Sequence, residues 1–245
     1  MILLVDAGNT RVKWRVIAAD APARALAEGA VGHAEIDMLA AACRAWPGLA
    51  RVFGCNVAGT SVAARIATAC APLRVDWLLP TAARAGVRNL YENPERLGAD
   101  RWAALIGARH SHAGPCLVVT AGTATTVDLL SAAGDFLGGL ILPGVELMQQ
   151  ALARGTAQLP LAEGRFAWQP RRTVDAIRSG CLQAQTGAVE RMFRQIAEHP
   201  GALCLLGGGA ADSFADLLEI PLRRTDNLVL TGLGTVATLP APPTH

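Results

Sequence analysis

The chain opens with an apolar run that stops at an acidic, glycine-containing turn. Ile2 to Val5 are all apolar, Asp6-Ala7-Gly8-Asn9 follows, and polar and apolar residues then alternate from Arg11 to Ile17. Continuous apolar residues are typical of a buried strand, and alternation is typical of a strand with one exposed face. The pattern predicts a buried strand, a tight turn and a half-exposed strand that returns beside it.

A similar pattern recurs near the middle of the chain. Leu117 to Val119 lead into Thr120-Ala121-Gly122-Thr123, and a threonine-rich strand follows from Ala124 to Leu130. Gly8 and Gly122 take equivalent places about half a chain apart, a period far longer than that of a solenoid. We expect two related α/β domains, residues 1–113 and 114–239, with a Pro-rich, disordered tail at 240–245.

The remaining periodicity predicts the other elements. Helices are expected at 36–45, 61–70, 100–110 and 172–197, the last interrupted at Gly180 or Gly187, and strands at 51–57 and 203–206. The second of these strands runs into Gly207-Gly208-Gly209-Ala210, after which a further helix is expected.

Composition restricts the class of protein. The 245 residues are 51% hydrophobic, enough for a large core, and carry a net charge of +2 with scattered arginines, which argues against nucleic acid as a partner. The N-terminus has no basic segment like that of a signal peptide, and no apolar run reaches the roughly 18 residues of a membrane span. The six cysteines form no CxxC pair, as expected for free thiols. We expect a cytoplasmic protein without a membrane partner.

The first turn has the chemistry of a phosphate-binding loop. Glycine lets backbone N–H groups approach an anion, and Lys13, the only lysine among 22 Lys and Arg residues, adds a compact cation. Asp6 would repel phosphate but suits Mg²⁺ that accompanies ATP. A bare hairpin turn explains the same residues without function.

The turn at Gly122 offers a second loop, with hydroxyl groups and Asp128. Two such loops at equivalent ends of two domains can converge on one cleft. The chain has no GxxxxGK[ST] or GxGxxG motif and no HExxH or GxSxG, which excludes P-loop, Rossmann, zincin and serine-hydrolase sites. The five histidines are scattered, and surface positions are the expected reading for them.

The segment from Tyr91 to Arg101 is the remaining candidate. It contains the only tyrosine and enters a predicted helix at Asp100. Asp100 fits a proton acceptor for an attacking alcohol, and Arg101 fits an anchor for an acidic substrate or for the transferred phosphoryl group. The favourable position of an aspartate at a helix start explains Asp100 equally well.

These motifs together resemble type III pantothenate kinases. Asp6 to Lys13 resembles the family's DxGNTxxK phosphate loop, Gly98-Ala99-Asp100-Arg101 resembles its GxDR element, and Gly122 to Asp128 resembles its second phosphate loop. Gly138 to Gly144 is similar to the family's GGxIxPG stretch, and the order and spacing match over nearly the whole chain.

The resemblance implies an actin-like α/β fold of the acetate-and-sugar-kinase class, with two ribonuclease-H-like domains that have mixed five-stranded sheets, in a homodimer. It implies phosphorylation of pantothenate to 4′-phosphopantothenate, the first step of coenzyme A synthesis, with ATP, Mg²⁺ and a monovalent cation, K⁺ or NH₄⁺. Asp100 would be the proton acceptor, and Asp6 would hold Mg²⁺. The residues implied to bind ATP are Asp6, Ala7, Gly8, Asn9, Thr10, Arg11, Val12, Lys13 and Thr123. Those implied to bind pantothenate are Tyr91, Gly98, Ala99, Asp100, Arg101 and Thr173.

One position departs from the family pattern. Thr120 stands where many members have an aspartate that holds the monovalent cation, and a hydroxyl group adds no charge there. The cation requirement therefore stays open. Because some family members were first described as accessory factors for transcription, a regulatory protein is the competing class. A related kinase for another hydroxylated acid, or a phosphohydrolase, is the third.

Overall fold

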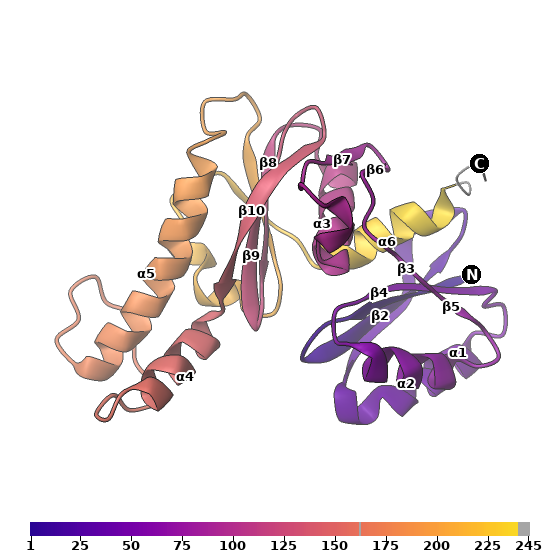
Figure 1. The fold of residues 1–245 in the computed structure, drawn as a ribbon, viewed down its shortest axis with the longest axis horizontal. Coiled ribbons are helices and arrows are strands. Elements are labelled where there is room, and N and C mark those ends of the chain that lie inside the picture. Colours follow the sequence, from indigo (N-terminus) through magenta and orange to yellow (C-terminus); the bar gives the residue numbers. More distant parts are fainter. Residues whose placement is uncertain (162, 240–245) are drawn as a thin grey trace. The chain divides into compact units, whose positions relative to one another are not determined.

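The computed structural model describes residues 1–161 and 163–239, which form two compact units (Figure 1). Unit 1 comprises residues 1–113, the short segment 134–136 and the chain from Asn227 onward. Unit 2 comprises residues 114–133 and 137–226.

Unit 1 is built on a five-stranded mixed sheet in the order β3-β2-β1-β4-β5. The strands are β1 (Ile2–Ala7), β2 (Arg11–Ala18), β3 (Ala21–Gly32), β4 (Arg51–Asn56) and β5 (Val75–Trp77). β1 pairs antiparallel with β2 and parallel with β4, and all six of its residues are buried. The predicted hairpin of one buried and one half-exposed strand is therefore confirmed.

Helices cover both faces of this sheet, as Figure 1 shows. The helical elements are η1 (His33–Met38), α1 (Leu39–Ala45), α2 (Thr60–Cys70), η2 (Pro94–Arg96), α3 (Ala99–Ser111) and α6 (Leu228–Thr238). On one face, Leu3 and Val5 share a core with Ile36 and Ile66 from the η1-α1 and α2 segments. On the other face, Leu4 contacts α6 near Gly234, as alternation along a strand requires.

Two glycines allow α3 and α6 to pack with their backbones in contact. A Cβ atom at Gly232 would lie 1.8 Å from the Ala103 carbonyl oxygen, and one at Gly107 would lie 2.1 Å from the Leu228 carbonyl oxygen. No side chain fits at either position. This contact attaches the C-terminal helix to unit 1.

Unit 2 contains five strands in the order β12-β11-β8-β9-β10. They are β8 (Cys116–Ala121), β9 (Ala124–Leu130), β10 (Asp135–Pro143), β11 (Leu203–Gly207) and β12 (Leu222–Arg224). Its helices are α4 (Val145–Gly155) and α5 (Thr173–Phe193), and side chains of α5 such as Val189 and Phe193 pack on Leu117 and Leu129 of the sheet.

The two five-strand sets have the same order, because β8, β9 and β11 repeat the pairing of β1, β2 and β4. This order is the one expected for two ribonuclease-H-like domains, but the second sheet has seven strands in place of the expected five. Two further short strands, β7 (Val87–Asn89) and β6 (Ala83–Arg84), belong to unit 1, where β7 pairs with Asp135 and Phe136 at the start of β10.

Two details of the predicted elements are wrong. The helix at 172–197 is not interrupted at Gly180 or Gly187, since α5 is continuous from Thr173 to Phe193. The segment after Gly207 forms only two short turns of 3₁₀ helix, Ala211–Ser213 and Ala215–Leu217, in place of a longer helix. Among the described residues, no helix is long and apolar enough to cross a membrane.

The compact units differ from the predicted domain ranges at two places. Residues 134–136 and the chain from Asn227 onward belong to unit 1, because β10 begins beside β7 and α6 packs on α3. The tail at 240–245 lies outside the described residues.

The contact between α3 and α6 yields a stability prediction. Gly232→Ala should lower the free energy of unfolding by about 3 kcal/mol, because the methyl group has no space without moving a helix. Gly187→Ala is the matched control, since nothing lies within 4 Å of a Cβ there, and it should raise stability by about 0.5–1 kcal/mol through helix propensity. Urea denaturation measures both, and equal stabilities for the two variants would contradict the prediction.

Candidate active site

Asp6 lies at the end of β1, between residues of both neighbouring strands. It pairs with Lys13 of β2 and with Cys55 of β4, and the Cys55 thiol donates to Asp6 Oδ1 at 3.6 Å. Only 8% of Asp6 is exposed, and this burial is the main reason that its pKa is raised from 3.8 to about 6. Lys13 lowers this pKa, whereas the negative charge of Asp100 raises it. The structure therefore brings Asp6, Lys13 and Asp100 into one electrostatic cluster.

The turn after Asp6 is a tight hairpin in which the Gly8 N–H donates to the Arg11 carbonyl oxygen at 3.1 Å. A Cβ atom at Gly8 would lie 3.4 Å from that oxygen, so the turn itself tolerates a side chain. Asn9, Thr10 and Arg11 are exposed beyond it. Since the hairpin does not require glycine, the open space at Gly8 is available to a ligand that approaches the backbone.

Tyr91 and Arg101 form a second group in unit 1. Arg101, on the first turn of α3, is only 6% exposed, and its NH1 donates to the Tyr91 hydroxyl at 2.8 Å. The guanidinium carbon lies 5.6 Å from the centre of the Tyr91 ring and 5.7 Å from that of Phe136. These aromatic rings hold a buried cation in a fixed orientation, which suits recognition of a carboxylate.

Asp100 precedes Arg101 at the start of α3, and its carboxylate accepts the Arg101 N–H at 2.8 Å. A Cβ atom at Gly98 would lie 2.7 Å from Asp100 Oδ1. Glycine at position 98 thus leaves room for the carboxylate. Ala99 is the first residue of the helix, directly before Asp100 and Arg101.

A magnesium ion fits the acidic residues of this unit. Among the described residues, no three His, Cys, Asp or Glu side chains gather into a protein-only metal site. Mg²⁺ bound with a nucleotide needs only one or two carboxylates beside phosphate oxygens and water. Asp6, with Asp100 near it, supplies such a set.

The second glycine turn lies in unit 2. The Gly122 N–H donates to the Ala124 carbonyl oxygen at 3.0 Å, and Thr123 is exposed at the tip. Two other glycines brace this turn: a Cβ at Gly144 would lie 2.2 Å from the Gly122 carbonyl oxygen, and one at Gly208 would lie 2.1 Å from that of Ala121. The glycines at 144 and 208 therefore support the turn through close backbone packing.

Thr120 and Thr173 are the other candidate site residues of unit 2, and only Thr120 adjoins this turn. Thr120 is half-buried at the end of β8, opposite Thr126 of β9 and Gly207 of β11. Thr173 is exposed as the first residue of α5. A cavity of about 400 Å³ near Glu146 and Arg178 is lined by none of the predicted residues, so the proximity of Asp6 and Asp100 is the better guide to the chemistry.

Three residues of unit 1 contact the predicted site without having been predicted. Cys55 donates to Asp6, Asn89 accepts the Tyr91 N–H at 3.1 Å, and the His33 ring bonds to the Gly8 carbonyl oxygen at 2.8 Å. Cys55 and His33 come from elements distant in sequence, so no spacing pattern marks them. Asn89, by contrast, lies two residues before Tyr91, a spacing at which asparagine side chains commonly bond the backbone. His33, for which a surface position is expected, is half-buried.

Known proteins resemble this chain over nearly its whole length. The family model for type III pantothenate kinase matches residues 2–195. A type III pantothenate kinase from Aromatoleum aromaticum is 60% identical over 239 residues, which cover 97% of this chain and 98% of that protein.

Solved structures show the fold. A protein from Campylobacter jejuni named as a Baf family transcriptional activator has a TM-score of 0.61 at 20% identity, with 96% of each chain covered. A protein from Sinorhizobium meliloti named as a 2-dehydro-3-deoxygalactonokinase has a TM-score of 0.60 at 17% identity, covering 97% of this chain and 98% of that one. The expected actin-like kinase fold is confirmed. From the family match and the sequence identity together, this chain belongs to the type III pantothenate kinase family.

Proposed function

We propose that this protein transfers the γ-phosphoryl group of ATP to the hydroxyl group of pantothenate, with Asp100 as the proton acceptor. The product is 4′-phosphopantothenate, which is used for coenzyme A synthesis. The main support is that Asp100 lies close enough to Asp6 for its negative charge to add to the burial that raises the pKa of Asp6, so the proposed proton acceptor is a neighbour of the proposed phosphate loop. Membership of the kinase family supports the use of both substrates.

Arg101 and Tyr91 are proposed to bind the carboxylate of pantothenate. The guanidinium is already oriented by the Tyr91 hydroxyl and by two aromatic rings, so little side-chain entropy is lost when the substrate binds. Asp100, the adjacent residue, would then face the hydroxyl end of a bound substrate. Gly98 and Ala99 form the helix start that carries this pair, and Thr173 is proposed as a further substrate contact.

The segment from Asp6 to Lys13 is proposed to bind the phosphates of ATP. Lys13 supplies the cation, and the open space at Gly8 allows phosphate oxygens to approach the backbone. Asp6 would hold Mg²⁺, which neutralises negative charge on the phosphates when bound. Thr123 is proposed to contribute to the nucleotide site from the second turn.

The monovalent cation is the least constrained part of the proposal. Thr120 offers a neutral oxygen where a carboxylate would add charge, so any K⁺ or NH₄⁺ here would bind through neutral oxygen ligands. We propose that the protein still responds to such a cation.

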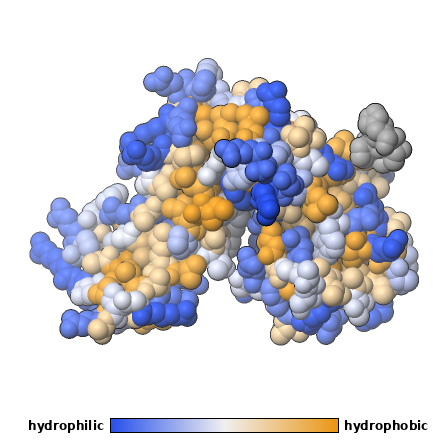
Figure 2. All heavy atoms as spheres, in the orientation of Figure 1, coloured by the Kyte–Doolittle hydropathy of each residue, from blue (hydrophilic) through white to orange (hydrophobic). Residues whose placement is uncertain are grey.

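A homodimer is proposed from the surface of unit 2. Leu137 and Ile141 of β10 are 51% and 65% exposed, and Leu161 and Trp168 are 66% and 68% exposed. Figure 2 shows hydrophobic surface over the β10, α4 and α5 part of this unit. Such patches are typical of protein interfaces.

A cytoplasmic location is also proposed. The free cysteine thiols and the use of ATP as a substrate support it.

The decisive test measures ATP consumption and 4′-phosphopantothenate formation with Mg²⁺, in separate reactions with K⁺, NH₄⁺ or Na⁺. We expect pantothenate-dependent turnover that rises with K⁺ or NH₄⁺. No product under any of these conditions would favour the regulatory class of protein, and ATP cleavage without pantothenate would favour a hydrolase.

Asp100→Asn should leave ATP affinity nearly unchanged but lower kcat by about 10²–10⁴-fold, because the amide cannot accept the hydroxyl proton. Steady-state kinetics with nucleotide binding by calorimetry measures both quantities. Asp20→Asn, at an exposed turn position, is the matched control and should keep full turnover. Wild-type kcat in the Asp100 variant would remove that residue from the proposed role.

Because of Asp6, the free energy of unfolding should fall as the pH rises. Its folded pKa of about 6 exceeds the ordinary value of 3.8, so the folded state holds a proton that the unfolded state releases between these pH values. Stability therefore falls as pH increases through this interval and stays lower above it. Without divalent cations, Asp6→Asn should be more stable than wild type by about 2 kcal/mol near pH 8 and by little near pH 4, while losing activity. Denaturation curves at both pH values check this, and an unchanged difference between them would contradict it.

A further inference from the structure

His33 is placed beside the first glycine turn by the register of the sheet. β3 pairs with β2 so that its last residue, Gly32, lies opposite Arg11, the first residue after the turn. The chain then leaves the sheet as η1, which begins at His33. The Gly32 N–H donates to Glu35 Oε2 at 3.3 Å, which stabilises this change from strand to helix. His33 is therefore a neighbour of the turn although 25 residues separate it from Gly8.

The His33 ring acts as a hydrogen-bond donor to the turn. Its Nε2 lies 2.8 Å from the Gly8 carbonyl oxygen, and because a carbonyl only accepts, this nitrogen carries the proton. The Gly8 N–H is already bonded to Arg11, so both backbone polar groups of Gly8 are held. In a trans peptide the carbonyl and the following N–H point in opposite directions. By holding the Gly8 carbonyl, His33 therefore directs the Asn9 N–H to the side of the turn away from the imidazole.

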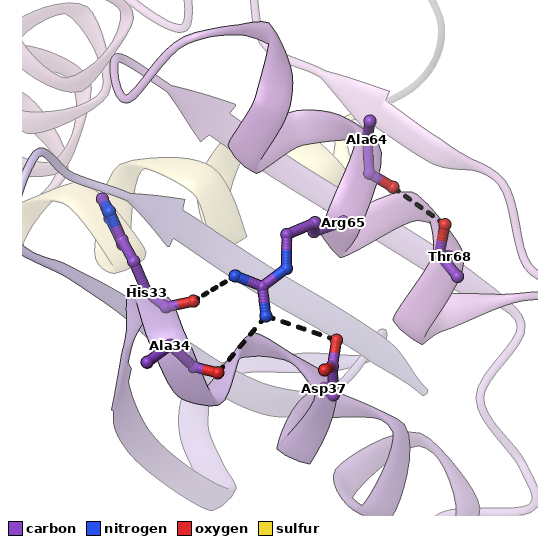
Figure 3. A network of polar contacts seen from close by, with 6 residues as sticks. All are labelled: His33, Ala34, Asp37, Ala64, Arg65 and Thr68. Carbon is purple, nitrogen blue, oxygen red and sulfur yellow. Dashed lines mark hydrogen bonds and ion pairs between the residues drawn. The ribbon is translucent and has the colours of Figure 1, made fainter.

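Arg65 of α2 holds His33 in turn. As Figure 3 shows, the Arg65 guanidinium donates to the backbone carbonyl of His33 and, at 3.3 Å, to that of Ala34. The same group lies 3.5 Å from Asp37 Oδ1, but the Asp37 side chain is 83% exposed, so water weakens this ion pair. Of these polar contacts, the two to backbone carbonyls therefore do most to hold η1 against α2, beside the core that Ile36 and Ile66 share.

We propose that His33 is a positioning residue for ATP, which aims the Asn9 amide at the phosphates through the Gly8 carbonyl, and that Arg65 keeps His33 in place. This inference rests on the proposed binding of ATP by the segment from Asp6 to Lys13. Because the contact acts on the nucleotide loop and not on Tyr91 or Arg101, its loss should affect ATP without affecting pantothenate.

The first test compares His33→Leu with His33→Gln. His33→Leu removes the donor and should raise the KM for ATP by about three- to tenfold, the usual effect of one lost hydrogen bond, with the KM for pantothenate unchanged. Glutamine carries an N–H at similar reach, so His33→Gln should restore most of the ATP affinity. His199→Leu, at an exposed position, is the matched control and should have wild-type kinetics.

The second test separates the backbone contacts of Arg65 from its ion pair. Arg65→Met removes all three contacts and should raise the KM for ATP in the same direction as His33→Leu. Asp37→Asn removes only the ion pair and should leave both KM values unchanged. A combined His33→Leu and Arg65→Met variant should be no worse than His33→Leu alone, since both act through one contact.

Two outcomes overturn the inference. One is an unchanged KM for ATP in His33→Leu, and the other is an equal defect in His33→Gln, which would indicate loss of packing and not of a hydrogen bond. The variants Lys13→Met and Gly8→Ala test the underlying proposal that the loop binds ATP. If both variants leave ATP binding unchanged, the loop is not the nucleotide site. If both weaken ATP binding and His33→Leu does not, only the proposed role of His33 is wrong.

Discussion

The burial of the Asp6 carboxylate at the end of a central strand is the constraint on which the site depends. β1 lies between β2 and β4, and all six of its residues are buried. Desolvation makes the charged form of Asp6 costly, and Lys13 offsets only part of that cost. If Asp6 holds Mg²⁺ as proposed, the cation would offset the rest of that cost when it binds. The proposed role of Asp6 and the stability of the fold would then be opposed.

The glycines of the chain serve two different physical purposes. At Gly232 and Gly107, and at Gly144 and Gly208, a side chain would collide with a backbone carbonyl of the same unit. At Gly8 and Gly122 the protein leaves the space open, with the closest carbonyl oxygen at 3.4 Å and 3.6 Å. Close backbone packing requires glycine at the first four positions. No contact within the fold requires it at Gly8 or Gly122. Ligand approach, as proposed for the two turns, would account for glycine at these two positions.

The residues proposed to bind substrate depend on support from neighbours both near and far in the sequence. Arg101 is oriented by the rings of Tyr91 and Phe136. Phe136 lies in the short segment 134–136, which belongs to unit 1 although the residues on either side of it belong to unit 2. Asn89 fixes the loop after β7 by accepting the Tyr91 N–H and donating to the Pro94 carbonyl oxygen. The first glycine turn likewise depends on His33. Precise placement of the reactive groups thus comes from neighbours that carry no chemistry of their own.

The sequence by itself determined the local features of this protein and, by resemblance, its family. The apolar run of β1, the alternation in β2 and the repeat at β8 and β9 could be predicted because each depends on neighbours within a few residues. The start of a helix at Asp100 and Arg101 could be predicted for the same reason. Only the tertiary structure decided that α6 belongs with α3, that Phe136 stacks on Arg101 and that His33 bonds to the Gly8 carbonyl. These contacts join residues far apart in the chain, and they arise from strand register and close helix packing, which leave no periodic signal in a single sequence.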